Sequence, residues 1–186
     1  MIYLLPIGDI DLSVLLSLER SLKIAFEGFN INVDQYPEEI QLEDLDYDVK
    51  REQFLGSMVL QKISKVFREK YFFRILGVID KDIYTKNYNF IFGTANVLSK
   101  ISLISITRLR DEFYKELGVI YKKPTSNDKF DLRVSKEAIH ELGHTFGLTH
   151  CVNSCVMNKS NSLADTDNKP VNFCHFCLSK LNLDEA

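Results

Sequence analysis

The chain has 186 residues, of which 45% are hydrophobic and 26% are charged, and this composition is typical of a globular domain with one sizeable core. A formal net charge of −3 and a pI of about 5.8 argue against nucleic acid as the main partner. No apolar run approaches the roughly 20 residues of a membrane-spanning helix, and the N-terminus resembles no signal peptide, so we expect a cytoplasmic, reduced monomer that does not bind membranes.

The hydrophobic pattern predicts strands and helices that alternate along the first two thirds of the chain. The predicted strands are 2–7, 29–33, 72–79, 90–93 and 101–107. The predicted helices are 12–26, 51–67, a helical turn at 111–117, 134–146, and a last helix after Cys177. Residues 34–50 are expected to form a loop and 122–131 a linker, with Ser135 or a residue nearer Asp131 capping the helix that follows. This order predicts an α/β (α+β) fold in which helices pack against a mixed sheet.

The run HELGHTFGLTH at residues 140–150 is the most informative feature of the chain. Residues four apart lie on one face of a helix, so His140 and His144 can bind one metal ion from adjacent turns. Glu141 is rotated by roughly 100° from His140 and can instead take a proton from a water molecule beside the metal. Gly147 can adopt a positive φ, which lets the helix end and brings His150 back as a third ligand. Three imidazoles leave one tetrahedral position open, as in catalytic zinc sites, whereas the alternative is an amphipathic helix with surface histidines.

All four cysteines lie in one short C-terminal stretch, at Cys151, Cys155, Cys174 and Cys177. Four thiolates at this spacing can form a closed tetrahedral shell around a structural zinc ion. The alternative is two disulfides, which a reducing compartment disfavours. His175 could replace one cysteine as a ligand, although we expect it to face solvent from a loop. The sequence therefore predicts two zinc ions per chain, one catalytic and one structural.

Together these motifs resemble the archaemetzincin family of zinc metallopeptidases, which belongs to the metzincin clan. The family pattern HExxHxxGxxHC reads here as HELGHTFGLTHC, the pattern C-x-M as CVM at 155–157, and the closing CxxC as CHFC at 174–177. The stretches IYLLPIG and NYNFIFGTANV are similar to the family's first strand and its edge-strand region. The resemblance implies a mixed twisted sheet with packed helices, an active-site helix, a Met-turn and a C-terminal segment stapled by zinc. It places Met157 in the Met-turn, beneath the catalytic metal and not bound to it.

We expect one metallopeptidase domain over residues 1–186. Its N-terminal subdomain, 1–147, would contain the active-site helix, and its C-terminal subdomain, 148–186, would contain the Met-turn and the four-cysteine site. The expected activity is zinc-dependent hydrolysis of a peptide or protein substrate, with Glu141 as the general base. Aminopeptidase action is one candidate, but the sequence does not single out a carboxylate for the free amine. The alternative is a metal-binding structural or peptide-binding protein with little turnover.

The sequence leaves the group that stabilises the oxyanion open. Some metzincins use a tyrosine after the Met-turn, but the last tyrosine of this chain is Tyr121. Zinc, backbone N–H groups or an upstream residue would have to serve instead. The resemblance also suggests that the substrate lies along an edge strand near residues 89–96 and pairs with it as an added strand. On pattern alone, the alternative is that this stretch is an ordinary sheet strand and turn.

Overall fold

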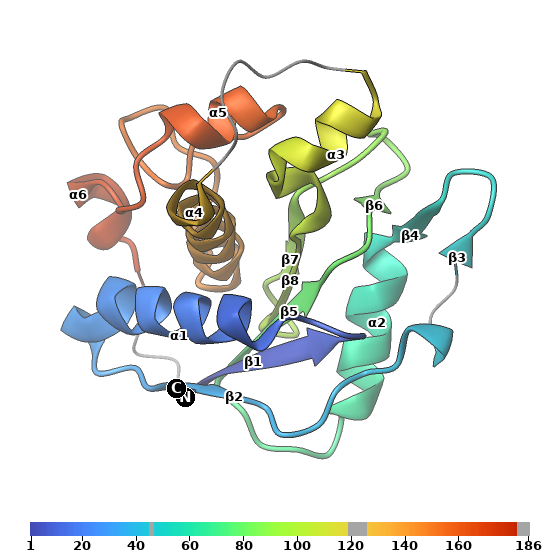
Figure 1. Cartoon of the computed structure of the whole chain (residues 1–186). Coiled ribbons are helices and arrows are strands. Elements are labelled where there is room, and N and C mark those ends of the chain that lie inside the picture. The colour runs from blue at the N-terminus through green and yellow to red at the C-terminus, as the bar shows by residue number, and fades with distance from the viewer. Residues whose placement is uncertain (45–46, 119–125, 182–186) are drawn as a thin grey trace.

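The computed structural model describes residues 1–44, 47–118 and 126–181. Its centre is a five-stranded sheet in the order β2-β1-β5-β8-β7 (Figure 1). The strands are β1 (Ile2–Ile7), β2 (Val33–Gln35), β5 (Arg74–Ile79), β7 (Gly93–Asn96) and β8 (Ile101–Ser105). The first four strands of this order are parallel, and β7 closes one edge as the antiparallel partner of β8. A second, small sheet pairs β3 (Tyr47–Asp48), β4 (Gln53–Leu55) and β6 (Ile83–Tyr84).

Helices cover both faces of the central sheet (Figure 1). Helix α1 (Leu12–Phe26) and helix α4 (Asn127–Thr145) share one apolar cluster with Leu76 and Val78 of β5. Helix α2 (Gly56–Val66) shares the other cluster with Ile75 and Ile79, whose side chains point to the opposite face. Burying each such side chain contributes roughly 1.5–3 kcal/mol to the stability of the fold. Apolar packing on both faces therefore stabilises the sheet, and α4 packs against a well-ordered surface.

The remaining elements are short. They are the 3₁₀ turns Glu27–Phe29, Leu42–Asp44 and Thr107–Leu109, and the helices α3 (Asp111–Glu116), α5 (Leu163–Asn168) and α6 (His175–Leu178). Among residues 1–44, 47–118 and 126–181, no helix combines the length and apolar character that crossing a bilayer requires.

The predicted mixed sheet with packed helices is confirmed, but several element boundaries were wrong. The strands expected at 72–79 and 101–107 are shorter and span Arg74–Ile79 and Ile101–Ser105. The strand expected at 29–33 begins only at Val33, because Asn30 adopts a left-handed conformation with φ 54° after a 3₁₀ turn. The helix expected from residue 51 begins at Gly56, because residues 53–55 pair in the small sheet as β4. The strand expected at 90–93 lies at Gly93–Asn96, where it pairs with β8.

The helix that carries the histidines is longer than its apolar pattern predicted. It begins at Asn127, where the Ser126 side chain accepts a hydrogen bond from the backbone N–H of Lys129. Ser135 is not the cap: it lies inside the helix, and its hydroxyl donates to the carbonyl of Asp131, one turn earlier. The predicted linker 122–131 is therefore helical from 127 onward, and residues 122–125 lie outside the described residues. The last helix, α6, contains Cys177 rather than following it, and α5 was not predicted.

A polar face of α4 holds the C-terminal segment against the helix. Arg133 donates to both carboxylate oxygens of Asp167, at 2.6 and 2.8 Å, and to Asp111 at 2.7 Å. Lys136, one turn along, donates to the backbone carbonyls of Thr166 and Asp167 at the end of α5. Charged donors are the stronger class of hydrogen bond, so this face fixes α5 relative to the histidines that follow on α4.

Candidate active site and metal centres

The three predicted histidine ligands come together at the C-terminal end of α4. His140 and His144 project from successive turns, and Gly147, with φ 86°, turns the chain so that His150 faces them. One nitrogen of each ring lies within 4.8 Å of the others. The arrangement is what one tetrahedral ion with three imidazole ligands requires.

The hydrogen bonds of His140 and His144 decide which nitrogens face the shared space. His140 Nδ1 lies 2.9 Å from the carbonyl of Val156, and His144 Nδ1 lies 2.7 Å from the carbonyl of Leu148. A carbonyl only accepts, so each Nδ1 carries the proton and each Nε2 presents a lone pair. These Nε2 atoms are 3.1 Å apart, which two lone pairs do not favour unless a cation lies between them. Nitrogens about 2.0–2.1 Å from one tetrahedral zinc would lie roughly 3.3 Å apart, so the residues fit this ion.

Burial favours the neutral, metal-binding form of the histidines. Loss of solvent lowers the pKa of His140 well below its usual value, and it lowers those of His144 and His150 as well. The nearby Lys169 ammonium lowers all three in the same direction. Protons therefore compete less with a metal here than at a free imidazole.

Glu141 lies beside this set with its carboxylate held at the end of strand β7. Its side chain is 6% exposed, and burial raises its pKa well above the usual value. No donor among the described residues makes a hydrogen bond to this carboxylate, which lines the same cavity as His140 and His150. The carboxylate is thus available to a water molecule or a substrate.

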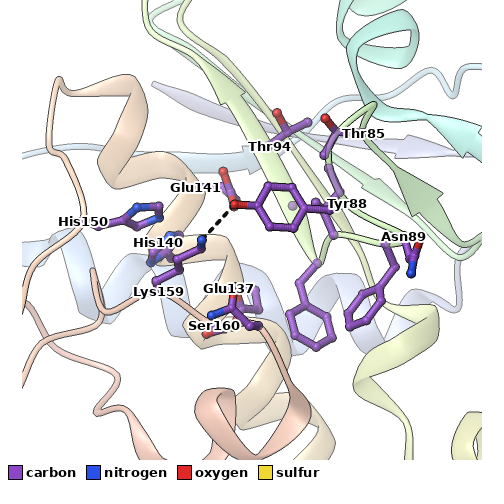
Figure 2. Close-up of a pocket in the computed structure, with 15 residues that line it drawn as sticks. Thr85, Tyr88, Asn89, Thr94, Glu137, His140, Glu141, His150, Lys159 and Ser160 are labelled. Atoms are coloured by element: carbon purple, nitrogen blue, oxygen red, sulfur yellow. Dashed lines mark hydrogen bonds between the residues drawn. The ribbon is translucent and has the colours of Figure 1, made fainter.

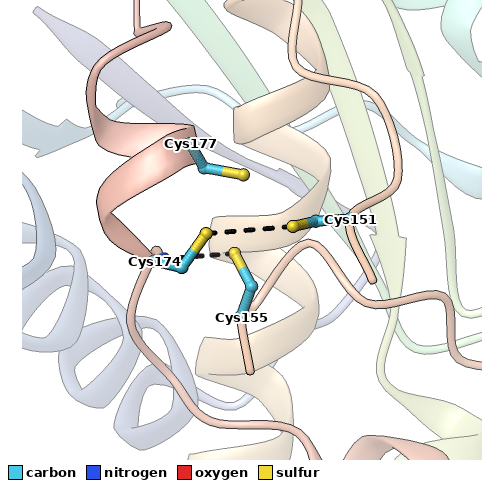
Figure 3. Close-up of side chains that lie close together, drawn as sticks. All are labelled: Cys151, Cys155, Cys174 and Cys177. Atoms are coloured by element: carbon cyan, nitrogen blue, oxygen red, sulfur yellow. Dashed lines mark hydrogen bonds between the residues drawn. The ribbon is translucent and has the colours of Figure 1, made fainter. Parts of the chain in front are cut away.

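The four cysteines also form one cluster (Figure 3). Their sulfur atoms lie within 4.8 Å of one another. Cys151 and Cys155 belong to the loop after α4, Cys174 is the N-cap residue of α6, and Cys177 lies in α6. The sulfurs of Cys151 and Cys174 are 3.8 Å apart, and sulfurs each about 2.3 Å from one tetrahedral zinc would be separated by roughly that distance. All four thiols are free rather than paired as disulfides. His175 is exposed and is not one of the clustered ligands.

The pKa values of the clustered thiols also indicate that a bound cation would stabilise the thiolate forms. A hydrogen bond from the backbone of Cys177 lowers the pKa of the Cys174 thiol to about 6. Burial raises the pKa of the Cys155 thiol, and it raises that of Cys177 strongly. The Cys174 thiolate therefore forms readily, whereas those of Cys155 and Cys177 resist, because their charge would lie in a poorly solvated place beside another thiolate. A divalent ion removes that resistance, so the donor set fits a structural zinc site.

Met157 is fully buried under the active-site helix. An added β-carbon at Gly143 would lie 2.5 Å from the Met157 sulfur, so the methionine packs directly against the backbone between His140 and His144. The backbone N–H of Cys151 donates to the carbonyl of Met157, which ties this turn to the cysteine loop. The Met-turn role that the family resemblance implies for Met157 stays a prediction.

A cavity of about 580 Å³ opens in front of these groups (Figure 2). The loop before β7 and β7 itself form one wall, α4 forms another, and residues 159–161 form the third. The polar lining residues that were missed from sequence are Thr85, Tyr88, Glu137, Lys159, Ser160 and Asn161. Glu137 could have been found from the helix period, because it lies one turn before Glu141. Lys159 and Tyr88 are brought together only by the fold.

Glu137 forms hydrogen bonds and an ion pair with neighbouring residues in the cavity wall. Its carboxylate accepts hydrogen bonds from Ser160 at 3.0 Å and Thr166 at 2.8 Å, and the Lys169 ammonium lies 3.0 Å away. Glu137 and Lys169 are 2% and 4% exposed. All three contacts are to Oε1, so this oxygen of the carboxylate supports the cavity wall.

Comparison with known structures gives the class of protein. The fold is similar to that of a zinc-dependent peptidase from Methanocorpusculum labreanum, with a TM-score of 0.81 and 26% identity over 98% of this chain and 100% of that one. It is also similar to the crystal structure of archaemetzincin from Archaeoglobus fulgidus complexed with malonate, with a TM-score of 0.75 and 34% identity over 96% and 98% of the chains. The fold and the histidine set thus define a zinc metallopeptidase.

Sequence comparison narrows this class to a family. A model of peptidase family M54 matches residues 8–183, and the chain belongs to this family. Archaemetzincin from Methanocaldococcus jannaschii is 38% identical over 95% of this chain and 89% of its own length. Archaemetzincin from Pyrococcus furiosus is 38% identical over 97% of this chain and 92% of its own length. The predicted resemblance to archaemetzincins is confirmed, and the substrates of this family are peptides.

Proposed function

We propose that this peptidase holds two zinc ions, one catalytic and one structural, and that Glu141 is its general base. His140, His144 and His150 would bind the catalytic ion, and the four cysteines would bind the structural ion. The observation that supports this most directly is the pair of unprotonated Nε2 atoms 3.1 Å apart, beside a carboxylate with no partner among the described residues. We also retain the predictions of a single domain with the boundary at residue 147, a monomeric state and a cytoplasmic location.

The chain's own residues would divide the reaction between them. Zinc, when bound, supplies Lewis-acid chemistry that polarises the scissile carbonyl and acidifies water. Glu141 takes a proton from the attacking water and returns it to the leaving nitrogen. Burial, which raises the pKa of this carboxyl, brings it closer to the working pH and so favours both transfers. The carbonyls of Val156 and Leu148 keep the rings of His140 and His144 in the required tautomer.

Strand β7 is placed where an extended peptide substrate could pair with it. One side of β7 pairs with β8, and its other side has no strand partner among the described strands of the central sheet, so β7 is an edge strand. Gly93 and Thr94 of this strand line the same cavity as Glu141. A substrate that added to the free side as a new strand would place its backbone along the cavity, next to the carboxylate.

Aminopeptidase action needs a carboxylate that receives the free amine. The carboxylates among the described lining residues are Glu137 and Glu141. Glu137 is engaged by Ser160, Thr166 and Lys169, and Glu141 is assigned to proton transfer. Aminopeptidase action therefore stays a prediction, which the positions of cleavage in a digest decide.

The test is digestion of a peptide library by the zinc-loaded chain, with mapping of the products. Glu141→Ala should retain both zinc ions and its thermal stability but lose hydrolysis by about 10²–10⁴-fold, the usual contribution of a general acid–base group. Glu69→Ala, which removes an exposed carboxylate elsewhere, is the matched control and should cleave normally. A Glu141→Ala variant as active as the parent contradicts the assignment. A parent that binds peptides without cleaving any would favour the alternative of a peptide-binding protein.

A further inference from the structure

Lys159 and Tyr88 meet at the cavity from opposite walls (Figure 2). The Lys159 ammonium donates to the Tyr88 hydroxyl at 3.0 Å and also lies 4.9 Å from the centre of its ring. Lys159 follows the turn that contains Met157, whereas Tyr88 lies in the loop before β7. The two side chains therefore connect the two segments between which an extended substrate would lie.

The charges that line the cavity leave Lys159 without a counter-ion. Of the two carboxylates among the described residues that line the cavity, Glu137 is paired with Lys169, and Glu141 lies against the backbone of Gly93 with no ion pair to Lys159. Lys159 is exposed and forms no ion pair with any carboxylate in the described part of the chain. Among the described lining residues it is the one lysine or arginine, so the open side of the cavity carries a positive charge with no fixed partner.

We propose that Lys159 and Tyr88 form a subsite that binds a carboxylate of the peptide substrate, an inference that rests on the peptide hydrolysis proposed above. The ammonium has three donor hydrogens and gives one to the tyrosine oxygen, so it retains donors for a ligand. The tyrosine hydroxyl accepts that bond and keeps its own hydrogen to donate. A carboxylate has two acceptor oxygens and can receive one bond from each residue, which makes both bonds charge-assisted.

Two sources supply such a carboxylate in a peptide, an acidic side chain or the C-terminus. The chemistry recognised is the same, and the position of the scissile bond relative to the subsite distinguishes them. Because Lys159 and Tyr88 are both substantially exposed, water screens the interaction, and we expect a preference of about five- to tenfold rather than the larger effect of a buried pair.

The test compares kcat/KM for matched acid and amide peptides. One arm exchanges Glu for Gln at each position near the scissile bond, and the other exchanges a C-terminal carboxylate for a carboxamide. The zinc-loaded parent should favour the acid in one arm by about five- to tenfold. Lys159→Met should remove that preference, so that the acid and amide peptides are cleaved with similar kcat/KM, and Tyr88→Phe should reduce the preference in part.

Lys86→Met is the matched control, because Lys86 is an exposed lysine of the same loop as Tyr88 but does not line the cavity. It should keep the preference. Equal cleavage of acid and amide peptides by the parent overturns the subsite while leaving the peptidase function in place. A preference that survives in Lys159→Met overturns it as well.

A binding measurement separates failure of the subsite from failure of the peptidase function. Calorimetry on zinc-loaded Glu141→Ala should show the same five- to tenfold preference for the acid peptide, and Glu141→Ala/Lys159→Met should not. If the parent cleaves nothing but this binding preference depends on Lys159, the subsite stands and the hydrolytic function fails. If neither acid nor amide peptide is preferred in binding, the subsite is wrong.

Discussion

The backbone of Gly93 lies against the side chain of Glu141. A β-carbon at residue 93 would be 2.5 Å from Glu141 Cγ and 2.8 Å from its Oε1 atom. The first residue of β7 therefore determines where the proposed base can lie. The same strand is the one along which we expect the substrate to bind, so substrate and base are positioned by one element.

Gly93→Ala should lower kcat strongly with little loss of zinc. The added methyl group overlaps Glu141 and must displace its carboxylate, and a misplacement of about 1 Å in a catalytic group can cost on the order of 10²-fold in rate. The histidines remain in place because they do not contact Gly93 in this way. Steady-state kinetics together with metal analysis on the purified variant measures the two effects.

Gly28→Ala is the control for this substitution, because no atom lies within 4 Å of the added β-carbon. It should retain full activity. If Gly93→Ala retained the parental kcat, the position of Glu141 would be unimportant, and its role as base would be in doubt.

Two zinc ions should be bound by each chain in the native, metal-replete protein. The histidine and cysteine sets are each complete and each converge within 4.8 Å, so neither needs a ligand from elsewhere in the chain. Native mass spectrometry should show both ions, and Cys174→Ser and His144→Ala should each lose a different one. One zinc ion together with two disulfides would contradict the four-thiolate site.

Sequence reasoning grouped the candidate metal ligands as the fold does, because their spacing itself encodes geometry. The interval between His140 and His144 is one helical turn, and the interval between Cys174 and Cys177 is typical of a zinc knuckle. Strand β1 and helix α1 were also predicted with their observed bounds, since both bury continuous or strictly periodic apolar positions. Whether these residues hold zinc in solution stays a prediction.

Features that depend on long-range contacts could not be predicted in this way. Residues 53–55 have an apolar pattern compatible with a helix and form a strand because β3 and β6 pair with them. The start of α4 is polar, and Ser126 defines it through a single side-chain hydrogen bond. Lys159 and Tyr88 are 71 residues apart, and no local pattern indicates that they meet.

Cys174→Ser should destabilise the fold more than His144→Ala. The cysteine cluster joins α6 to the loop after α4, and the free energy of zinc binding in a closed site contributes directly to folding. His144 instead lies on a helix that is already packed against the sheet and α1. In a chain of this size each 1 kcal/mol lowers Tm by about 2–4 °C, so thermal melts of the two zinc-loaded variants resolve the difference. Equal losses, or a larger loss in His144→Ala, would contradict this order.

The ion pair between Arg133 and Asp167 should make stability depend on pH only in the acid range. Burial acts to raise the pKa of Asp167, but hydrogen bonds from Arg133 and Lys129 outweigh it and leave that pKa below its usual value of 3.8. A carboxyl with a lowered pKa in the folded state contributes stability that is present above its unfolded pKa and is lost as the pH falls through its folded pKa.

Asp167→Asn should therefore destabilise the chain by about 1–2 kcal/mol near neutral pH, a value reduced from that of a fully buried pair because the Asp167 side chain is 26% exposed. The difference from the parent should be constant between about pH 7 and pH 5 and should shrink below about pH 4, where the parental carboxylate becomes protonated too. Denaturant titrations of both proteins across this range give the difference directly. Asp9→Asn, which changes an exposed carboxylate, is the control and should alter stability little at any pH. A difference that disappears already between pH 7 and pH 6 would mean that another group, and not Asp167, controls the attachment of α5 to α4.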